Sequence, residues 1–169
     1  MRLKNRGLAA LATAFPALGE RLAAGYRAQR QDEGVPWAPL RKPRGAATVA
    51  LVTTAGVHHR DQPPFDMNDP DGDPTFRELD LLRPLDSLMI THDYYDHADA
   101  DRDLNVVFPA ERLRELAAAG EIGAVARFGY GFMGHITGRH LETLKRRTAP
   151  EVAARLVKQG VDAVLLAPG

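Results

Sequence analysis

The sequence predicts an α/β protein: a three-layer, open and mainly parallel sheet with helices on both faces, together with an N-terminal helix. Short runs rich in apolar and β-branched residues, TVALVTT (48–54) and VDAVLLA (161–167), are typical of strands covered on both faces. Helical segments alternate with such runs along the chain. This alternation favours a parallel sheet connected by right-handed crossovers.

The first segment, residues 1–34, is predicted to be a helical extension that packs on the domain or on a partner. Charged residues interrupt every apolar stretch of membrane-spanning length, and no convincing signal cleavage site follows the short apolar run. We therefore expect a cytoplasmic protein. The apolar positions at helical spacing are Leu8, Leu11, Phe15, Leu18 and Leu22.

Residues 35–169 are predicted to form one α/β domain, and an irregular Pro- and Gly-rich connector at 34–45 leads from the helical extension into it. The first strand, 48–54, is followed by a turn at Gly56. The Pro-, Asp- and Gly-rich stretch 61–74 is expected to be a functional loop over the strand ends.

The second half of the domain repeats the pattern of strand and helix. A strand at 87–90 precedes a helix that begins near Pro109 and stops at Gly120. Another strand is predicted at 122–126, and Thr148 and Glu151 form a capping box for a helix ending at Gly160. Residues 161–167 form the last predicted strand.

The composition limits the possible functions. The 169 residues contain 22 Lys and Arg and 22 Asp and Glu, so there is no general field to attract nucleic acid or an anionic membrane. The absence of Cys excludes disulfides, thiolate ligands and a thiol nucleophile within these residues. Redox chemistry therefore cannot come from these side chains alone.

Polar residues gather after the strand at 87–90, in THDYYDHADADRD (91–103). His92, Tyr94, Asp96 and His97 supply proton donors and acceptors whose pKa values respond to burial. The segment also resembles the metallo-β-lactamase pattern, but Tyr94 replaces one histidine ligand. Metal-dependent hydrolysis is thus an alternative, and a structural role for these residues in turns and helix starts is another.

Three further segments contain candidate binding residues. In TTAGVHH (53–59), Thr53 and Thr54 could orient a ligand, Gly56 allows a close backbone approach and His58 could act as acid or base, while His59 is expected to face solvent. The segment FGYGFMGHI (128–136) is either a tight turn that packs aromatic residues or a ligand wall around Met133. Arg127 pairs with a substrate carboxylate or with a surface acid.

Taken together and in order, six segments resemble the selenoprotein B family, which serves the glycine, sarcosine, betaine and D-proline reductases. The resemblance runs from about Val35 to the end of the chain and leaves only the N-terminal helix outside. The segments are VPWAPLRKP (35–43), ALVTTAGVH (50–58), PFDMNDPDGD (64–73), ITHDYYDHADADRDLNVVFP (90–109), GEIGA (120–124) and FMGHI (132–136).

The resemblance implies chemistry that residues 1–169 cannot perform alone. In the family, the strand corresponding to 161–167 leads into a redox motif of selenocysteine, two residues and cysteine. A selenolate attacks the substrate carbon that bears nitrogen, and a pyruvoyl group on a partner subunit holds the amine as a Schiff base in the glycine and D-proline systems. A thiol reductant such as thioredoxin then restores the selenium. We expect selenocysteine directly after Gly169, encoded by a UGA codon read as stop, and an oligomeric complex.

The family resemblance also suggests roles for individual residues. His58, His92, Asp96 and His97 are predicted to orient substrate and transfer protons. Asp66 and Asp69 are predicted to bind a cationic amine or to contact the partner subunit. The substrate is a small amino acid or betaine, and the sequence does not choose among them. A subunit that binds a ligand or a partner without catalysis is the first alternative, and the metal-dependent hydrolase is the second.

Overall fold

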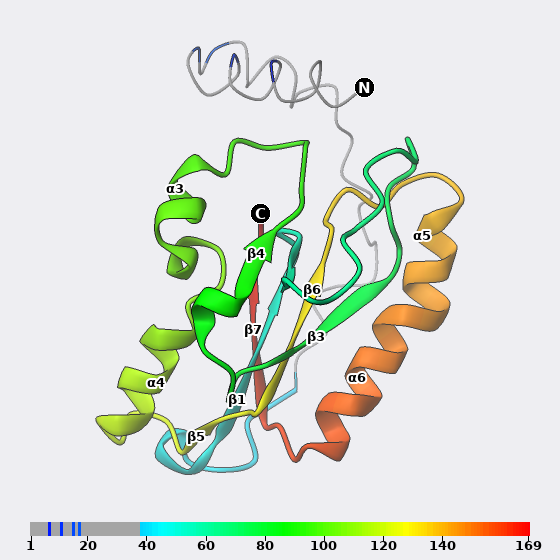
Figure 1. Ribbon diagram of the computed structural model, residues 1–169. Coiled ribbons are helices and arrows are strands. Elements are labelled where there is room, and N and C mark those ends of the chain that lie inside the picture. Colours follow the sequence, from blue (N-terminus) through cyan, green and yellow to red (C-terminus); the bar gives the residue numbers. More distant parts are fainter. Residues whose placement is uncertain (1–6, 8–10, 12–14, 16, 18–37) are drawn as a thin grey trace.

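The computed structural model describes residues 38–169 together with Gly7, Leu11, Phe15 and Ala17. Apart from these four positions, the helical extension predicted for residues 1–34 lies outside the described residues and stays a prediction. Within 38–169 the chain forms a mixed sheet with helices, so the predicted α/β class is confirmed (Figure 1).

Strand β1 is the centre of a five-stranded sheet. Along one edge it pairs with β7 in parallel register, from Val49 opposite Ala163 to Thr53 opposite Ala167. Its other edge is shared by β5 and β6, both parallel, and β3 pairs antiparallel with β6. The sheet is therefore mainly parallel. Its strands are β1 (Thr48–Thr53), β3 (Phe76–Asp80), β5 (Ala124–Val125), β6 (Phe128–Phe132) and β7 (Ala163–Ala167).

Alternate side chains of β1 enter two different core clusters, as the period-2 geometry of a strand requires. Leu51 packs in a cluster with residues of α3 (Ala98–Arg102) and α4 (Ala110–Ala118). Ala50 and Val52 pack with residues of α6 (Ala149–Lys158). Figure 1 shows α4 and α6 on opposite sides of the strands. The short 3-10 helices are η1 (Arg44–Ala46), η2 (Leu85–Ser87) and η3 (Leu104–Val106).

The strand predicted at 87–90 does not join the main sheet. It is β4 (Leu88–Ile90), and it pairs antiparallel with β2 (Val57–His59) in a separate two-stranded sheet. The reason is the turn at Gly56, which has a φ of 74° and brings the chain out of β1 directly into β2. A Cβ on Gly56 would lie 2.4 Å from the Thr91 carbonyl oxygen, so β2 and the end of β4 meet here at backbone distance.

The glycine-rich segment after Arg127 forms a strand rather than the tight turn that was one of its two interpretations, while its role as a ligand wall stays a prediction. It forms β6, and its glycines allow other backbones to approach closely. A Cβ on Gly131 would lie 2.1 Å from the Val57 carbonyl oxygen. Strand β3 was not predicted, because three of its five residues are charged.

The capping-box prediction at Thr148 and Glu151 is wrong. The helix begins earlier, at α5 (His140–Thr143), and runs through a π-helical segment, Leu144–Thr148, into α6. The Thr148 side chain makes no capping hydrogen bond. The predicted stops are confirmed, because Gly120 and Gly160 follow α4 and α6 with φ near 73°.

Candidate functional site

The carboxyl ends of β1, β6 and β7 meet at one edge of the sheet. The Gly169 amide donates to Thr54 Oγ1 at 3.2 Å, and the Thr54 amide donates to the Ala167 carbonyl at 3.1 Å. A Cβ on Gly169 would lie 2.4 Å from Ala55 Cα, and a Cβ on Gly134 would lie 2.3 Å from the Thr54 carbonyl oxygen. Thr54, Ala55, Gly134 and Gly169 therefore form one compact group, the strand-end cluster.

His92 lies directly beside the strand-end cluster. A Cβ on Gly134 would be 3.4 Å from its Nε2, and the side chain is only 5% exposed. Burial, and then the nearby His97 and His135 rings, lower the pKa of His92 to about 4, although a hydrogen bond to the Met133 backbone acts to raise it. The ring is therefore neutral near pH 7.

Aromatic rings surround His92 and border the strand-end cluster. The Tyr95 ring centroid is 4.6 Å from that of His92, and its hydroxyl donates to the Ala55 carbonyl at 3.1 Å. Burial raises the pKa of Tyr95, so the phenol stays protonated. Tyr94 stacks on His135 with centroids 4.0 Å apart, and Tyr95 contacts His97 at 5.5 Å. We call Tyr94, Tyr95, His97 and His135 the ring group.

His58 is fully committed to structural hydrogen bonds. Its Nδ1 donates to the His59 carbonyl at 2.8 Å, so Nε2 is the acceptor for the Thr91 hydroxyl, also at 2.8 Å. Burial lowers the pKa of His58 and favours this neutral form. The expectation that His59 faces solvent is wrong: β4 pairs alongside it, the side chain is buried, and Nδ1 bonds Ser87 Oγ at 3.0 Å.

Other predicted residues also support the backbone. Thr53 Oγ1 donates to the Val107 carbonyl at 2.9 Å and accepts the Ala55 amide at 3.1 Å. Asp96 Oδ1 accepts the Ala98 amide at the start of α3. His97 pairs with Asp101 through Nδ1 at 2.8 Å, which leaves Nε2 as the ring nitrogen that could meet a ligand.

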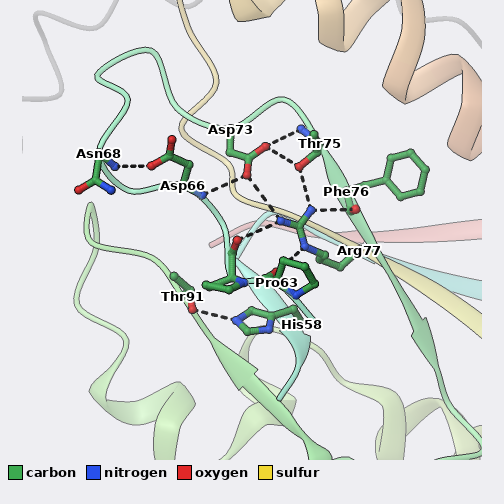
Figure 2. A network of polar contacts seen from close by, with 10 residues as sticks. His58, Pro63, Asp66, Asn68, Asp73, Thr75, Phe76, Arg77 and Thr91 are labelled. Atoms are coloured by element: carbon green, nitrogen blue, oxygen red, sulfur yellow. Dashed lines mark hydrogen bonds and ion pairs between the residues drawn. The ribbon is translucent and has the colours of Figure 1, made fainter. Parts of the chain in front are cut away.

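The acidic loop, residues 61–74, is organised by Arg77 (Figure 2). The guanidinium donates to the Pro63 carbonyl at 2.8 Å, to the Pro64 carbonyl at 3.1 Å, and lies 4.4 Å from the Phe65 ring centroid. Asp73 accepts the amides of Asp66 and Thr75 from the other side. Burial opposes its ionisation, but the hydrogen bond from the Thr75 hydroxyl, these two amide hydrogen bonds and the Arg77 charge hold the pKa of Asp73 below its usual value.

The two candidate acids of this loop have different surroundings. Asp69 Oδ2 pairs with Arg139 and with His140 Nε2, the latter at 2.9 Å. The His140 hydrogen bond, followed by the Asp71 amide, lowers the pKa of Asp69. Asp66 is exposed, and its Oδ1 accepts the Asn68 amide at 2.8 Å. Asp69 therefore fastens the loop to α5, whereas Asp66 faces outward.

Arg127 and Met133 lie at opposite ends of β6. Arg127 precedes the strand and forms a two-pronged ion pair with Asp80, at 2.9 and 3.2 Å. It is therefore separated from the strand-end cluster by the length of β6. Met133 follows the strand and is buried in a small core cluster with Phe65 and Met67.

A cavity of about 570 Å³ lies elsewhere, along β4, α3 and η3. Its polar lining includes Arg60, Asp86, Arg102 and Glu111, and no predicted site residue lines it. Among residues 38–169 and the four described positions before them, no three His, Asp or Glu side chains are grouped so as to hold a metal ion. In the same described part, no helix is long and apolar enough to cross a membrane.

Comparison with known proteins decides the family. The profile described as "Glycine/sarcosine/betaine reductase selenoprotein B" matches residues 18–168. The chain belongs to the selenoprotein B family. The match begins upstream of Val35, where the resemblance in the sequence motifs began, so part of the N-terminal segment also lies within the family.

Relatives in this family include reductase subunits. The chain is 39% identical over 133 residues to the D-proline reductase subunit gamma of Acetoanaerobium sticklandii, covering 79% of this chain and 53% of that protein. It is 31% identical to the glycine reductase complex component B subunit gamma of Carboxydothermus hydrogenoformans, covering 78% of this chain and 30% of that one. The betaine reductase complex component B subunit beta of Peptoclostridium acidaminophilum is 32% identical, covering 76% and 29%.

The chain therefore spans about half the length of the D-proline reductase subunit and under a third of the other two relatives. No solved structure matches it.

Sequence reasoning missed four residues that shape the site. Tyr95, Gly134 and His135 adjoin His92, and Arg77 holds the acidic loop. Gly134 and His135 lie within FMGHI, one of the motifs that carried the family resemblance, so that signal was present in the sequence. Arg77 gave no such signal, because in the sequence it looks like any surface arginine.

Proposed function

We propose that the chain forms the substrate-positioning part of a selenoprotein B-type reductase subunit, which cleaves a carbon–nitrogen bond in a small amino acid or a betaine reductively. Its family and the names of its relatives support this class of reaction. Those relatives are a D-proline reductase subunit, a glycine reductase component and a betaine reductase component.

The observation that carries the proposal is the position of Gly169. Its amide bonds Thr54 Oγ1, and Thr54 in turn lies against Gly134 and, through it, His92. A redox residue directly after Gly169 would therefore begin beside the strand-end cluster and the ring group. We propose selenocysteine at that position, as in the family. Like a low-pKa thiolate, a selenolate would attack without a separate base, forming a carbon–selenium bond while the carbon–nitrogen electron pair leaves with the amine. The cysteine of the same motif would then take selenium from carbon, the carbon keeping the electron pair and gaining a proton, and a dithiol would reduce the selenium–sulfur bond that results.

The residues of this chain would bind and orient the substrate. Aromatic ring faces attract an ammonium group, and the half-buried Tyr94 and Tyr95 beside His92 would supply them, although His135 already covers one face of Tyr94. His97, whose Nδ1 pairs with Asp101, would use Nε2 to exchange a proton with the leaving amine. His58 and His92 bond protein groups in the present geometry, and so we propose that they position the two turns that surround the substrate.

The partners follow from the same proposal. A pyruvoyl-containing subunit would hold glycine or D-proline through its amine, and a dithiol protein such as thioredoxin would return the oxidised selenium to the selenolate. The relatives' names, which describe subunits and complex components, support an assembly of several chains. Exposed Asp66, on the outer side of the acidic loop, is the proposed contact for the partner or for a cationic amine.

The test is to produce the complete gene product with its partner subunit and a dithiol. The products to measure are ammonia from glycine, methylamine from sarcosine, trimethylamine from betaine and the opened ring from D-proline. We expect one of them to form, and we expect His97→Asn to lower kcat about 10²-fold or more, as for loss of a proton-transfer group. The control Arg83→Gln, in an exposed ion pair with Asp61, should leave kcat unchanged.

The alternative outcomes separate the competing functions. Binding of a substrate without any cleavage by the complete, selenium-containing protein would support the non-catalytic binding subunit instead. If the complete protein neither binds nor cleaves any of the four compounds, the proposed substrate class is refuted. A kcat unchanged in His97→Asn would remove His97 from proton transfer while leaving the reaction class in place.

A further inference from the structure

Strands β3 and β7, on opposite sides of β1 in the main sheet, differ sharply in character. At one side, β3 carries three charged residues, Arg77, Glu78 and Asp80. Charges are the usual protection of an exposed strand edge against pairing with another chain. At the other side, β7 has the sequence AVLLA, without a charge or a proline, and within the described part of the chain it pairs only with β1. An unprotected edge of this kind is typical of a strand that is paired in the native protein.

Both faces of β7 also carry exposed apolar side chains in the described part of the chain. Val164 and Leu165 are 40% exposed, and Leu166 is 70% exposed. The parallel register places Val164 beside Ala50 and Leu166 beside Val52, on the face that α6 covers further along the sheet. Leu165 lies beside Leu51 on the opposite face. The apolar surface of the sheet therefore continues past α6 and over β7.

Helix α6 adds another exposed apolar side chain beside β7. Its Leu156 is buried against the sheet, while Arg155 turns toward β3, where it bonds Glu78 at 3.0 Å. Successive residues of a helix are 100° apart, so Val157 faces the other flank, toward β7. Val157 is 76% exposed. Val157, Val164 and Leu166 thus line one apolar strip between α6 and the free edge of the sheet.

We propose that this strip and the edge of β7 are covered by a helix followed by a parallel strand, supplied by polypeptide that continues from Gly169. The strand pairs with β7, and the helix packs beside α6 on the strip. The inference rests on the exposed edge and on the length of the relatives, one of which is about twice as long as its matched part, and it is independent of the proposed chemistry.

Topology supports this choice of occupant and of face. The connection from β6 to β7 runs through α6 and passes across β1. Parallel connections are right-handed in nearly all proteins, so a further step in the same direction places its helix on the same face as α6. That is the face on which Val157, Val164 and Leu166 are exposed. A second copy paired through β7 would cover the edge but would bring no additional helix onto the strip.

The test compares residues 1–169 with a chain continued through the codons that follow Gly169, with cysteine in place of any selenocysteine. Hydrogen exchange of the β7 amides is expected to slow about tenfold or more in the continued chain. Leu166→Ser is expected to lower its Tm by several degrees, roughly 3 °C or more, while leaving the Tm of residues 1–169 unchanged. The matched control is Leu82→Ser, because Leu82 is similarly exposed and lies in the turn after β3. This control should leave the Tm of both chains unchanged.

Three results would overturn the inference. The first is a gene with no open frame for a helix and a strand after codon 169. The second is a continued chain whose Tm is affected no more by Leu166→Ser than by Leu82→Ser. The third is a dimer of residues 1–169 whose β7 amides are already protected, which would assign the edge to a second copy. None of these measurements depends on reductase activity, so failure of the proposed function would leave them unaffected.

Discussion

The Tyr94 amide donates to Nδ1 of His92 at 3.0 Å, which determines the tautomer of the histidine ring. A backbone N–H can only donate, so Nδ1 is the acceptor and the ring proton is on Nε2, on the side of the Met133 backbone. The turn after β4 is thereby tied to the segment after β6. Protonation of His92 would add a second N–H where the Tyr94 amide already points.

This geometry predicts acid sensitivity. The pKa of His92 is lowered from 6.5 to about 4 in the folded state, so between these values the unfolded chain binds more protons. Stability from this group is fully present above pH 6.5 and is lost as the pH falls toward 4. We expect the free energy of unfolding to drop by about 2 kcal/mol between pH 7 and pH 5, measured by urea denaturation.

His58 and His59 should also make the protein less stable in acid, because burial lowers their pKa values as well. The His92→Gln variant separates the contributions. It should be less stable at pH 7 but should lose less stability on acidification than the unaltered protein. If both proteins show the same pH dependence, His92 is not the group responsible.

The two glycines Gly56 and Gly120 have φ angles of 74° and 73° but different surroundings. A Cβ on Gly56 would meet the Thr91 carbonyl oxygen at 2.4 Å, whereas a Cβ on Gly120 would meet nothing within 4 Å. Gly120→Ala should therefore lower the free energy of unfolding by only about 1 kcal/mol, because alanine disfavours the left-handed conformation. Gly56→Ala should cost roughly 3 kcal/mol or more, because β2 and β4 must also separate. Equal losses in thermal unfolding would contradict the close approach.

Removing the guanidinium of Arg77 should loosen the acidic loop. Its side chain is 13% exposed and donates to the Pro63, Pro64 and Phe76 carbonyls, which Arg77→Met would leave unpaired. We expect a loss of about 2–4 kcal/mol and faster proteolysis within 61–74. Arg83→Met, which breaks an exposed pair with Asp61, should cost less than about 1 kcal/mol. Similar losses in the two variants would show that Arg77 does not organise the loop.

Tyr95→Phe removes one hydrogen bond at the strand-end cluster. The hydroxyl donates to the carbonyl of Ala55, a fully buried residue, so we expect a loss of about 1–2 kcal/mol. Amide exchange around Ala55 and Gly56 should become faster, while the amides of α6, on the other face of the sheet, should be unaffected. Unchanged exchange at Ala55 would mean that the hydroxyl does not hold this turn.

Some parts of the fold could be predicted from local signals. The strands at Thr48–Thr53 and Ala163–Ala167 are apolar runs, and Gly120 and Gly160 end helices because glycine accepts a positive φ. Strand β6 was missed because its glycines resemble a turn, although they are required by backbones that cross at Gly129 and Gly131. The helix through Thr148 was misjudged because a capping-box pattern is only local and does not exclude a helix that continues from upstream.

The candidate site shows the same division. The motifs THDYYDH and FMGHI placed His92 and Met133 near strand ends, and the resemblance carried by them and the other motifs gave the family. Sequence spacing did not show that both ring nitrogens of His58 bond the protein, or that Arg127 lies at the far end of β6 beside Asp80. Those facts depend on which strand lies beside which.

The amino-acid order by itself determined the α/β class, the turn glycines and the family, because these depend on short-range propensity and on motif order. Only the tertiary structure decided that β4 leaves the main sheet, that Gly169 lies against Thr54, and that one edge of the sheet is apolar and uncovered. The physical reason is that strand pairing and burial are set by residues far apart in the chain. Local sequence patterns contain little information about such partners.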